Sequence, residues 1–333
     1  MSNCFALVLA LLAVLGGTAV AAENPSSAKS AASAAAAKPA ATSRSHFENE
    51  PPVKLGEKLT ETPADGTVIE KFLVHSAAMN RNVHVCIILP PAYASEPDKK
   101  FPVLYALHGS DGPYEMYSQM LPLRMALKTK PMLVVGFDGD GRGWYIDSTV
   151  FPDSQFETFF FKELIPYIEK NYRARAEAKA RGVTGDSMGG YGSFHYLAVH
   201  PELFASASSM SGIFHVLPTD LLGDPGKNKE AYDRLVVVRG LEADLAKGLK
   251  LPPLFLTCGT EDHLLRESRD LRDWLTAKKI PFEYLEKPGG HSWPFWRDSS
   301  PDIIDFHWRS FQGNYKVMEH AAPAPAKPAE GAK

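Results

Sequence analysis

The segment GDSMG, from Gly185 to Gly189, places one serine midway between two glycines. It fits the G-x-S-x-G pattern, in which the serine occupies a sharp turn between a strand and a helix and projects its hydroxyl above a sheet. The preceding GVTG reads as a strand, and the following residues read as a helix that Pro201 ends. Side chains in place of the glycines would collide with the strand and the helix. The pattern predicts Ser187 as a nucleophile; the alternative is a glycine-rich turn with an incidental serine.

A serine hydroxyl becomes a nucleophile when a base takes its proton, and an acid must orient that base. In sites with this pattern the acid and then the histidine follow the serine along the chain. His291, in EKPGGHSWPFW after the last expected strand, is the best placed of 11 histidines. Glu261 and Asp262 follow a buried strand, at the edge where catalytic groups collect. Their spacing alone does not decide which of the two orients the histidine, and we favour Asp262.

Two backbone N–H groups are needed to stabilise the negative charge that develops in such a reaction. One is expected from Met188, directly after the nucleophile, and the other from Ser110 in the loop LYALHGSDG. His108 in the same loop resembles a base, but a role in shaping the loop suits it better. The sequence therefore predicts an oxyanion hole between this loop and the start of the following helix.

Aromatic residues flank the expected catalytic loops and are candidate walls of a substrate pocket: Trp144, Tyr145, Trp293 and Trp296. The alternative is that they are ordinary packing residues. Their position beside these loops favours the pocket.

The segment DGDGRG, which contains Asp138 and Asp140, resembles a calcium loop. Arg142 stands where a ligand belongs, however, and Thr149 where the bidentate Glu is required. We therefore expect no metal site in this loop, and the sequence gives no sign of a cofactor.

Strands and helices alternate around these residues. Eight segments with alternating or continuous apolar residues are expected to be strands: 68–74, 81–89, 102–107, 132–137, 182–185, 205–210, 253–258 and 281–286. Helical spacing of apolar residues predicts helices at 155–172, which Pro166 bends or divides, and at 267–279. This order predicts an α/β fold: a mostly parallel central sheet of about eight strands with helices on both faces. The first two strands are expected to form an antiparallel hairpin.

The two ends of the chain differ from the middle. Residues 1–22 have the apolar core and small residues of a secretory signal peptide, although no Lys or Arg precedes the core. An uncleaved anchor is the alternative. Residues 23–54 and 317–333 are rich in Ala, Pro and other small or polar residues, and we expect a disordered spacer and tail around a folded domain at 55–316. Cys86 and Cys258 lie in apolar strands and are expected to be buried and free; a disulfide between them is the alternative.

The motifs LHGSDG, GWYIDS, ELIPYIEKNY, GDSMGGYGSFHYLAVHPELF, CGTEDHL and GGHSWPFW occur here in the order seen in one family. Over roughly 65–310 the chain resembles the putative-esterase branch of the α/β-hydrolases, which includes tributyrin esterases, esterase D (S-formylglutathione hydrolase), feruloyl esterases and mycolyltransferase antigens. The resemblance implies an α/β-hydrolase fold. It also implies a site composed of Ser187 as nucleophile, Asp262 as acid, His291 as base, and Ser110 and Met188 at the oxyanion hole. Many relatives lack the Ala-rich spacer and the Pro/Ala tail.

These observations lead us to expect an exported serine carboxylesterase, periplasmic or secreted, that acts on short-chain or aromatic acyl esters through an acyl-enzyme intermediate. Its partner is expected to be a small-molecule or polysaccharide-linked ester. The net charge of -3 and the lack of a basic run disfavour nucleic acid, and no stable membrane insertion is expected after signal cleavage. An acyltransferase and an S-formylglutathione hydrolase-like thioesterase would use the same triad, although the expected signal weakens the latter. An inactive binding module is the non-enzymatic alternative. The oligomeric state is left open.

Overall fold

The computed structural model describes residues 53–110, 112–141, 143–215, 219–223, 232–233, 235–313 and 315–318. All of them belong to one compact unit, Lys38–Lys333. The expected signal peptide at 1–22, nearly all of the spacer and nearly all of the tail lie outside the described residues.

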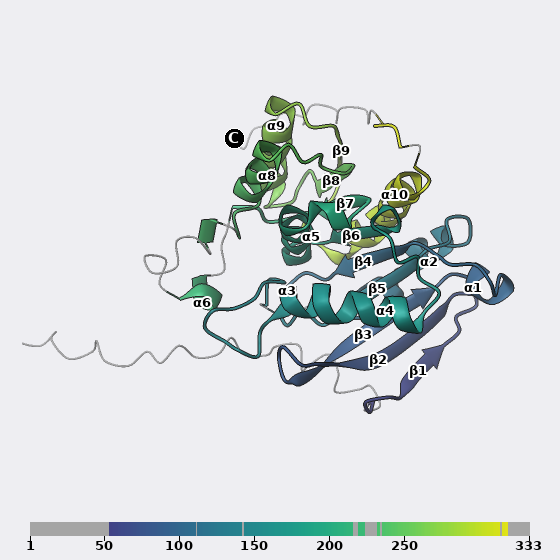
Figure 1. Cartoon of the computed structure of the whole chain (residues 1–333). Coiled ribbons are helices and arrows are strands. Elements are labelled where there is room, and N and C mark those ends of the chain that lie inside the picture. The colour runs from purple at the N-terminus through teal and green to yellow at the C-terminus, as the bar shows by residue number, and fades with distance from the viewer. Residues whose placement is uncertain are drawn as a thin grey trace, which may run out of the picture. The chain divides into compact units, whose positions relative to one another are not determined.

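A nine-stranded mixed sheet forms the centre of the domain, in the order β1-β2-β3-β5-β4-β6-β7-β8-β9 (Figure 1). Its strands are β1 Lys58–Glu61, β2 Val68–Ser76, β3 Arg81–Leu89, β4 Val103–Leu107, β5 Leu133–Phe137, β6 Arg181–Gly185, β7 Ser206–Met210, β8 Leu254–Gly259 and β9 Phe282–Lys287. The pairs β1–β2, β2–β3 and β3–β5 are antiparallel, and every pair from β5 to β9 is parallel. The mostly parallel sheet and the opening hairpin are thus confirmed.

All eight expected strands are present, and β1 is the one that the sequence did not indicate. It has four residues and lies at the edge of the sheet, where three of them are exposed. An exposed edge strand has little apolar alternation to reveal it.

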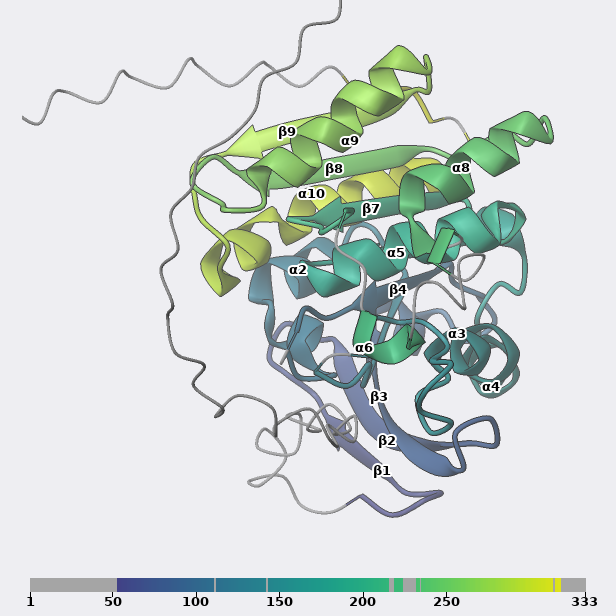
Figure 2. The ribbon, with the colours of Figure 1, turned by 90° about the vertical axis from the view of Figure 1, so that its left-hand side faces the viewer.

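Helices cover both faces of the sheet. They are α1 Ala92–Ser95, α2 Leu121–Ala126, α3 Phe156–Phe159, α4 Ile165–Asn171, α5 Met188–Val199, α6 Thr219–Leu222, α8 Val237–Ala246, α9 Leu265–Ala277 and α10 Trp293–Phe311. Figure 2 shows α5, α8 and α9 on the near side of the parallel strands and α10 on the far side. A π-helical turn, Phe160–Leu164, joins α3 to α4, and Pro166 lies in the first turn of α4. The predicted helix at 155–172 thus runs without a break from Phe156 to Asn171, and the π-helical turn lies just before the proline, which has no N–H to donate.

Two hydrophobic layers result, one on each face of the sheet. In β4, Tyr105 and Leu107 belong to the layer beneath α3, α5, α8 and α9, whereas Leu104 and Ala106 belong to the layer beneath α2 and α10. Because both faces are covered, β4 is apolar at every position, as strands of parallel sheets usually are. The loops that follow the parallel strands β4, β6, β8 and β9 all leave the sheet at its carboxyl edge.

Cys86 and Cys258 are buried and free, as predicted. Within the described residues, no helix has both the length and the apolar character needed to cross a membrane.

Candidate active site

Ser187 occupies the turn between β6 and α5. Its backbone has φ 53° and ψ −117°, a conformation that costs a non-glycine residue of order 1–3 kcal/mol and that persists mainly at functional sites. The two motif glycines permit this turn, because a Cβ on Gly185 would overlap the backbone of Gly189, and one on Gly189 would overlap the carbonyl of Leu107. The G-x-S-x-G spacing therefore has a steric cause that the structure makes explicit.

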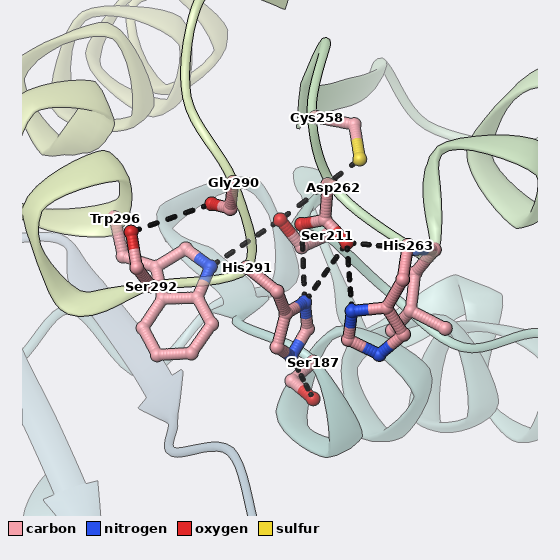
Figure 3. A network of polar contacts seen from close by, with 10 residues as sticks. Ser187, Ser211, Cys258, Asp262, His263, Gly290, His291, Ser292 and Trp296 are labelled. Atoms are coloured by element: carbon pink, nitrogen blue, oxygen red, sulfur yellow. Dashed lines mark hydrogen bonds and ion pairs between the residues drawn. The ribbon is translucent and has the colours of Figure 1, made fainter.

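His291 and Asp262 come from two other loops at the same edge of the sheet and meet Ser187 there (Figure 3). His291 Nε2 lies 2.9 Å from Ser187 Oγ, and His291 Nδ1 lies 3.0 and 3.1 Å from the two carboxylate oxygens of Asp262. The three side chains form a continuous hydrogen-bonded chain with the geometry required for base-assisted nucleophilic attack. Glu261, the other candidate acid, is exposed, and its amide donates to the Gly289 carbonyl.

Asp262 is held in place by its surroundings. Its carboxylate is buried and accepts hydrogen bonds from the Leu264 amide, at 2.7 Å, and from the Ser211 hydroxyl. Trp296 Nε1 in turn donates to Ser211 Oγ at 3.3 Å. Burial alone would raise the pKa of Asp262, but the hydrogen bonds from His291, Ser211 and Leu264 outweigh it and hold the pKa below its usual value. Asp262 is therefore a carboxylate at neutral pH and can orient the imidazole.

The loop after β4 lies directly against the nucleophile. A Cβ on Gly109 would lie 2.7 Å from Asp186 Oδ2 and 3.2 Å from Ser187 Cβ, so only glycine fits without displacing the loop. Ser110, the next residue, is exposed. Met188 is the first residue of α5, and its amide therefore has no acceptor within the helix. Of the two predicted oxyanion donors, Met188 thus follows the serine directly, and Ser110 follows Gly109, which lies against the serine.

Asp186 is a residue whose importance the sequence did not reveal. It is fully buried; its Oδ2 accepts the Gly109 amide at 3.0 Å, and its Oδ1 accepts the Tyr117 hydroxyl at 2.9 Å. Burial raises the pKa of Asp186 to about 7 despite these hydrogen bonds. The carboxyl joins the nucleophile turn to the loop after β4. It occupies a variable position of the motif, so the pattern could not single it out.

His108 shapes this loop, as its sequence context suggested. Its Nε2 lies 3.0 Å from the Gly139 amide, and its Nδ1 lies 2.7 Å from the Gly109 carbonyl. Since the amide can only donate, Nε2 accepts and Nδ1 carries the proton. His108 is thereby fixed as one neutral tautomer, away from the reacting serine.

The predicted pocket aromatics have different surroundings. Tyr145 is completely buried, and its hydroxyl donates to the His108 carbonyl at 2.8 Å, so its assignment as a pocket wall was wrong: it supports the loop from below. Trp144 is partly buried and packs edge-on against Tyr191. Trp293 is partly buried against the core layer beneath α10. Trp296, by contrast, stands perpendicular to the His291 ring with centroids 5.0 Å apart, which places an aromatic surface beside the base.

This sheet order, with a strained serine turn after β6 and the acid and histidine after β8 and β9, defines the α/β-hydrolase fold. Solved structures agree. A ferulic acid esterase superposes with a TM-score of 0.63 at 23% identity, over 74% of this chain and 100% of that one. An S-formylglutathione hydrolase from Agrobacterium tumefaciens superposes with a TM-score of 0.64 at 20% identity, over 78% of this chain and 100% of that one.

The chain belongs to the family described as "Putative esterase", whose model matches residues 76–306, more than half of the sequence. An esterase of Mycobacterium tuberculosis is 32% identical over 252 residues, which cover 66% of this chain and 55% of the relative. The chain thus spans about half the length of that relative. An acetyl esterase of Caldicellulosiruptor saccharolyticus is 26% identical over 269 residues, 71% of this chain and 96% of the relative.

Proposed function

We propose that this protein is an exported serine carboxylesterase that hydrolyses short-chain or aromatic acyl esters. The observation that carries the proposal is the hydrogen-bonded chain from Ser187 through His291 to Asp262, built on a strained turn at the carboxyl edge of the sheet. Membership of the esterase family supports it. The expected signal peptide at 1–22 motivates the exported, periplasmic or secreted, location.

In the proposed reaction Ser187 Oγ attacks the ester carbonyl carbon while His291 Nε2 takes the hydroxyl proton. Asp262 keeps the other imidazole proton on Nδ1 and stabilises the imidazolium that forms. The amides of Ser110 and Met188 hydrogen-bond the oxyanion. The tetrahedral intermediate then expels the alcohol, which receives the proton from Nε2, and an acyl-serine remains.

Water completes the cycle. It attacks the acyl-serine carbonyl carbon, gives a proton to His291 Nε2, and releases the carboxylic acid as that proton returns to Ser187 Oγ. No cofactor is required, because the serine, the imidazole and the backbone amides supply every group that the reaction uses.

Two observations support the substrate class. The relatives include an acetyl esterase, and the structural neighbours include a ferulic acid esterase. The Trp296 ring beside His291 offers an apolar surface to a short or planar acyl group. A thioester substrate or an acyl transfer to a second alcohol would proceed through the same acyl-serine. Thioester hydrolysis is therefore an outcome of the test rather than a separate proposal.

The test is a panel of acetate, butyrate, octanoate and ferulate esters, acetylated xylan and S-formylglutathione, assayed with the purified protein and with Ser187→Ala. We expect hydrolysis of the short or aromatic oxygen esters and a loss of at least about a thousandfold in Ser187→Ala. A serine-directed fluorophosphonate should label the protein but not this variant. Labelling that persists in Ser187→Ala, or turnover of the thioester alone, would contradict the proposal.

A further inference from the structure

A third titratable side chain, His263, lies beside Asp262 and His291 and takes no part in the proposed reaction (Figure 3). The His263 and His291 rings are 4.6 Å apart, and His263 Nδ1 is 3.7 Å from Asp262 Oδ1. The His263 side chain is 71% exposed, whereas that of His291 is 19% exposed and that of Asp262 is fully buried. A solvent-facing imidazole therefore stands at the open side of the acid–base pair.

We propose that Asp262, His263 and His291 form an inhibitory binding site for Zn²⁺ or a similar divalent transition metal. One ligand atom from each of the three side chains lies within 4.8 Å of the other two. With metal–ligand bonds of about 2.0–2.2 Å, the ligand atoms of a tetrahedral zinc site are roughly 3.3 Å apart. Asp262 Oδ1 lies 3.1 Å from His291 Nδ1 and 3.7 Å from His263 Nδ1, and these two distances bracket that value.

The donor set suits such an ion. Two imidazoles and a carboxylate are ligands that zinc, copper and nickel accept readily, whereas magnesium and calcium prefer oxygen ligands. Asp262 supplies a carboxylate oxygen that already lies close to a ring nitrogen of each histidine. His263 is exposed and can turn toward the ion, and water can complete the coordination from the same side.

Metal binding at this place opposes catalysis through the imidazole tautomer. In the free protein His291 carries its proton on Nδ1, donates it to Asp262, and keeps Nε2 unprotonated toward Ser187. A metal ion on Nδ1 displaces that proton, and the neutral ring then carries its proton on Nε2. Nε2 can then no longer accept the proton of Ser187 Oγ. His291 stays in place but no longer acts as the base.

Binding is measured first, because it does not depend on any esterase activity. We titrate Zn²⁺ by isothermal calorimetry into the untagged full chain and into Ser187→Ala, His263→Gln and His200→Gln. His200 is the matched control, since it is also exposed and lies 3.1 Å from a single carboxylate, that of Glu202.

We expect one Zn²⁺ per chain with equal affinity in the unchanged protein, Ser187→Ala and His200→Gln. Removing a direct ligand should cost at least what removal of a supporting partner costs, so His263→Gln should bind about tenfold more weakly or worse. Equal affinity in His263→Gln, or weakening in His200→Gln of the same size, overturns the proposed site.

The inhibitory part rests on the proposed esterase function and has its own measurement. Zn²⁺ should suppress hydrolysis by the unchanged protein, a chelator should restore it, and His263→Gln should need at least about tenfold more Zn²⁺ for the same suppression. If Zn²⁺ binds with the expected dependence on His263 while hydrolysis continues, the inhibitory role is overturned. If no ester is hydrolysed at all, the proposed function fails, and the calorimetry still decides the metal site.

Discussion

The buried carboxyl of Asp186 makes a specific prediction about how the stability of the folded chain depends on pH. Replacing Asp186 with Asn removes the ionisable group and keeps the hydrogen bonds. The amide oxygen can accept the Gly109 N–H, and the amide nitrogen can donate to the Tyr117 hydroxyl. That hydroxyl then turns to the Leu107 carbonyl, which lies 3.3 Å away. The variant therefore isolates the effect of charge from the effect of the lost contacts.

The magnitude follows from the pKa of Asp186, which burial raises from 3.8 to about 7. Below about pH 4 the carboxyl is protonated in both the folded and the unfolded chain and has no effect. Between about pH 4 and pH 7 the unfolded chain loses this proton and the folded chain keeps it, so stability falls by about 1.4 kcal/mol per pH unit. Above that window both states are ionised, and a loss of about 4 kcal/mol remains.

The assay is urea unfolding of the unchanged protein and of Asp186→Asn at pH 5 and pH 8. The Asn variant cannot ionise, so its free energy of unfolding relative to the unchanged protein should rise by about 2.5 kcal/mol between the two pH values. Asp186→Ala leaves the Gly109 amide without its acceptor and leaves the Tyr117 hydroxyl with the Leu107 carbonyl alone. It should be less stable than the Asn variant at both pH values.

Asp65→Asn is the matched control. Burial opposes ionisation of Asp65, but hydrogen bonds from Thr67 and Arg124 outweigh it and lower the pKa of this carboxyl, so it titrates below the tested window. Its effect on stability should be the same at pH 5 and pH 8. If Asp186→Asn shows the same pH-independent effect as Asp65→Asn, the carboxyl of Asp186 is already ionised in the folded chain at pH 5 and the reasoning is refuted.

Three further predictions concern the site and the chain's start. Asp262→Asn should keep its fold but lose turnover by about 10⁴-fold, because the amide favours the wrong imidazole tautomer. Glu261→Gln should lose less than about tenfold, and the reverse order in paired kinetic and melting measurements would reassign the acid. Gly109→Ala should slow ester hydrolysis while the melting temperature changes little, since the added Cβ meets Asp186 and Ser187 at the site. Unchanged kinetics would show that the loop adapts. N-terminal sequencing from the native host should begin near residue 22 or 23, and a sequence starting at residue 1 or 2 would contradict the cleaved signal.

The strands were predictable because buried strands consist of runs of apolar residues that can be recognised in the sequence. β4 and β5 are apolar throughout, since both faces of the parallel sheet are covered. The long helix α10 escaped prediction although it covers one face. It begins at Trp293 within a loop-like sequence and contains Pro301, which ordinarily signals a helix boundary. Packing of its apolar face against the sheet overrides that local signal.

The site was only partly predictable. Ser187, Asp262 and His291 lie in recognisable local motifs, and the structure brings them together. Asp186 and Ser211 do their work through contacts with residues distant in sequence, which no local pattern encodes. Tyr145 was assigned to the pocket because of its place in the sequence, but it is buried. An aromatic next to a site loop can line the pocket or lie beneath the loop, and only the packing decides which.

The hydrogen bonds that assemble the site join residues 77, 104 and 29 positions apart. Forming such a network carries an entropic cost, because the long loops between its members must close before any of these contacts is gained. His291 also follows β9, the last strand of the sheet. A chain still emerging from the ribosome therefore holds the nucleophile for more than a hundred residues without its base. Base-assisted attack by Ser187 therefore requires a chain that has been made at least as far as His291, beyond the last strand of the sheet.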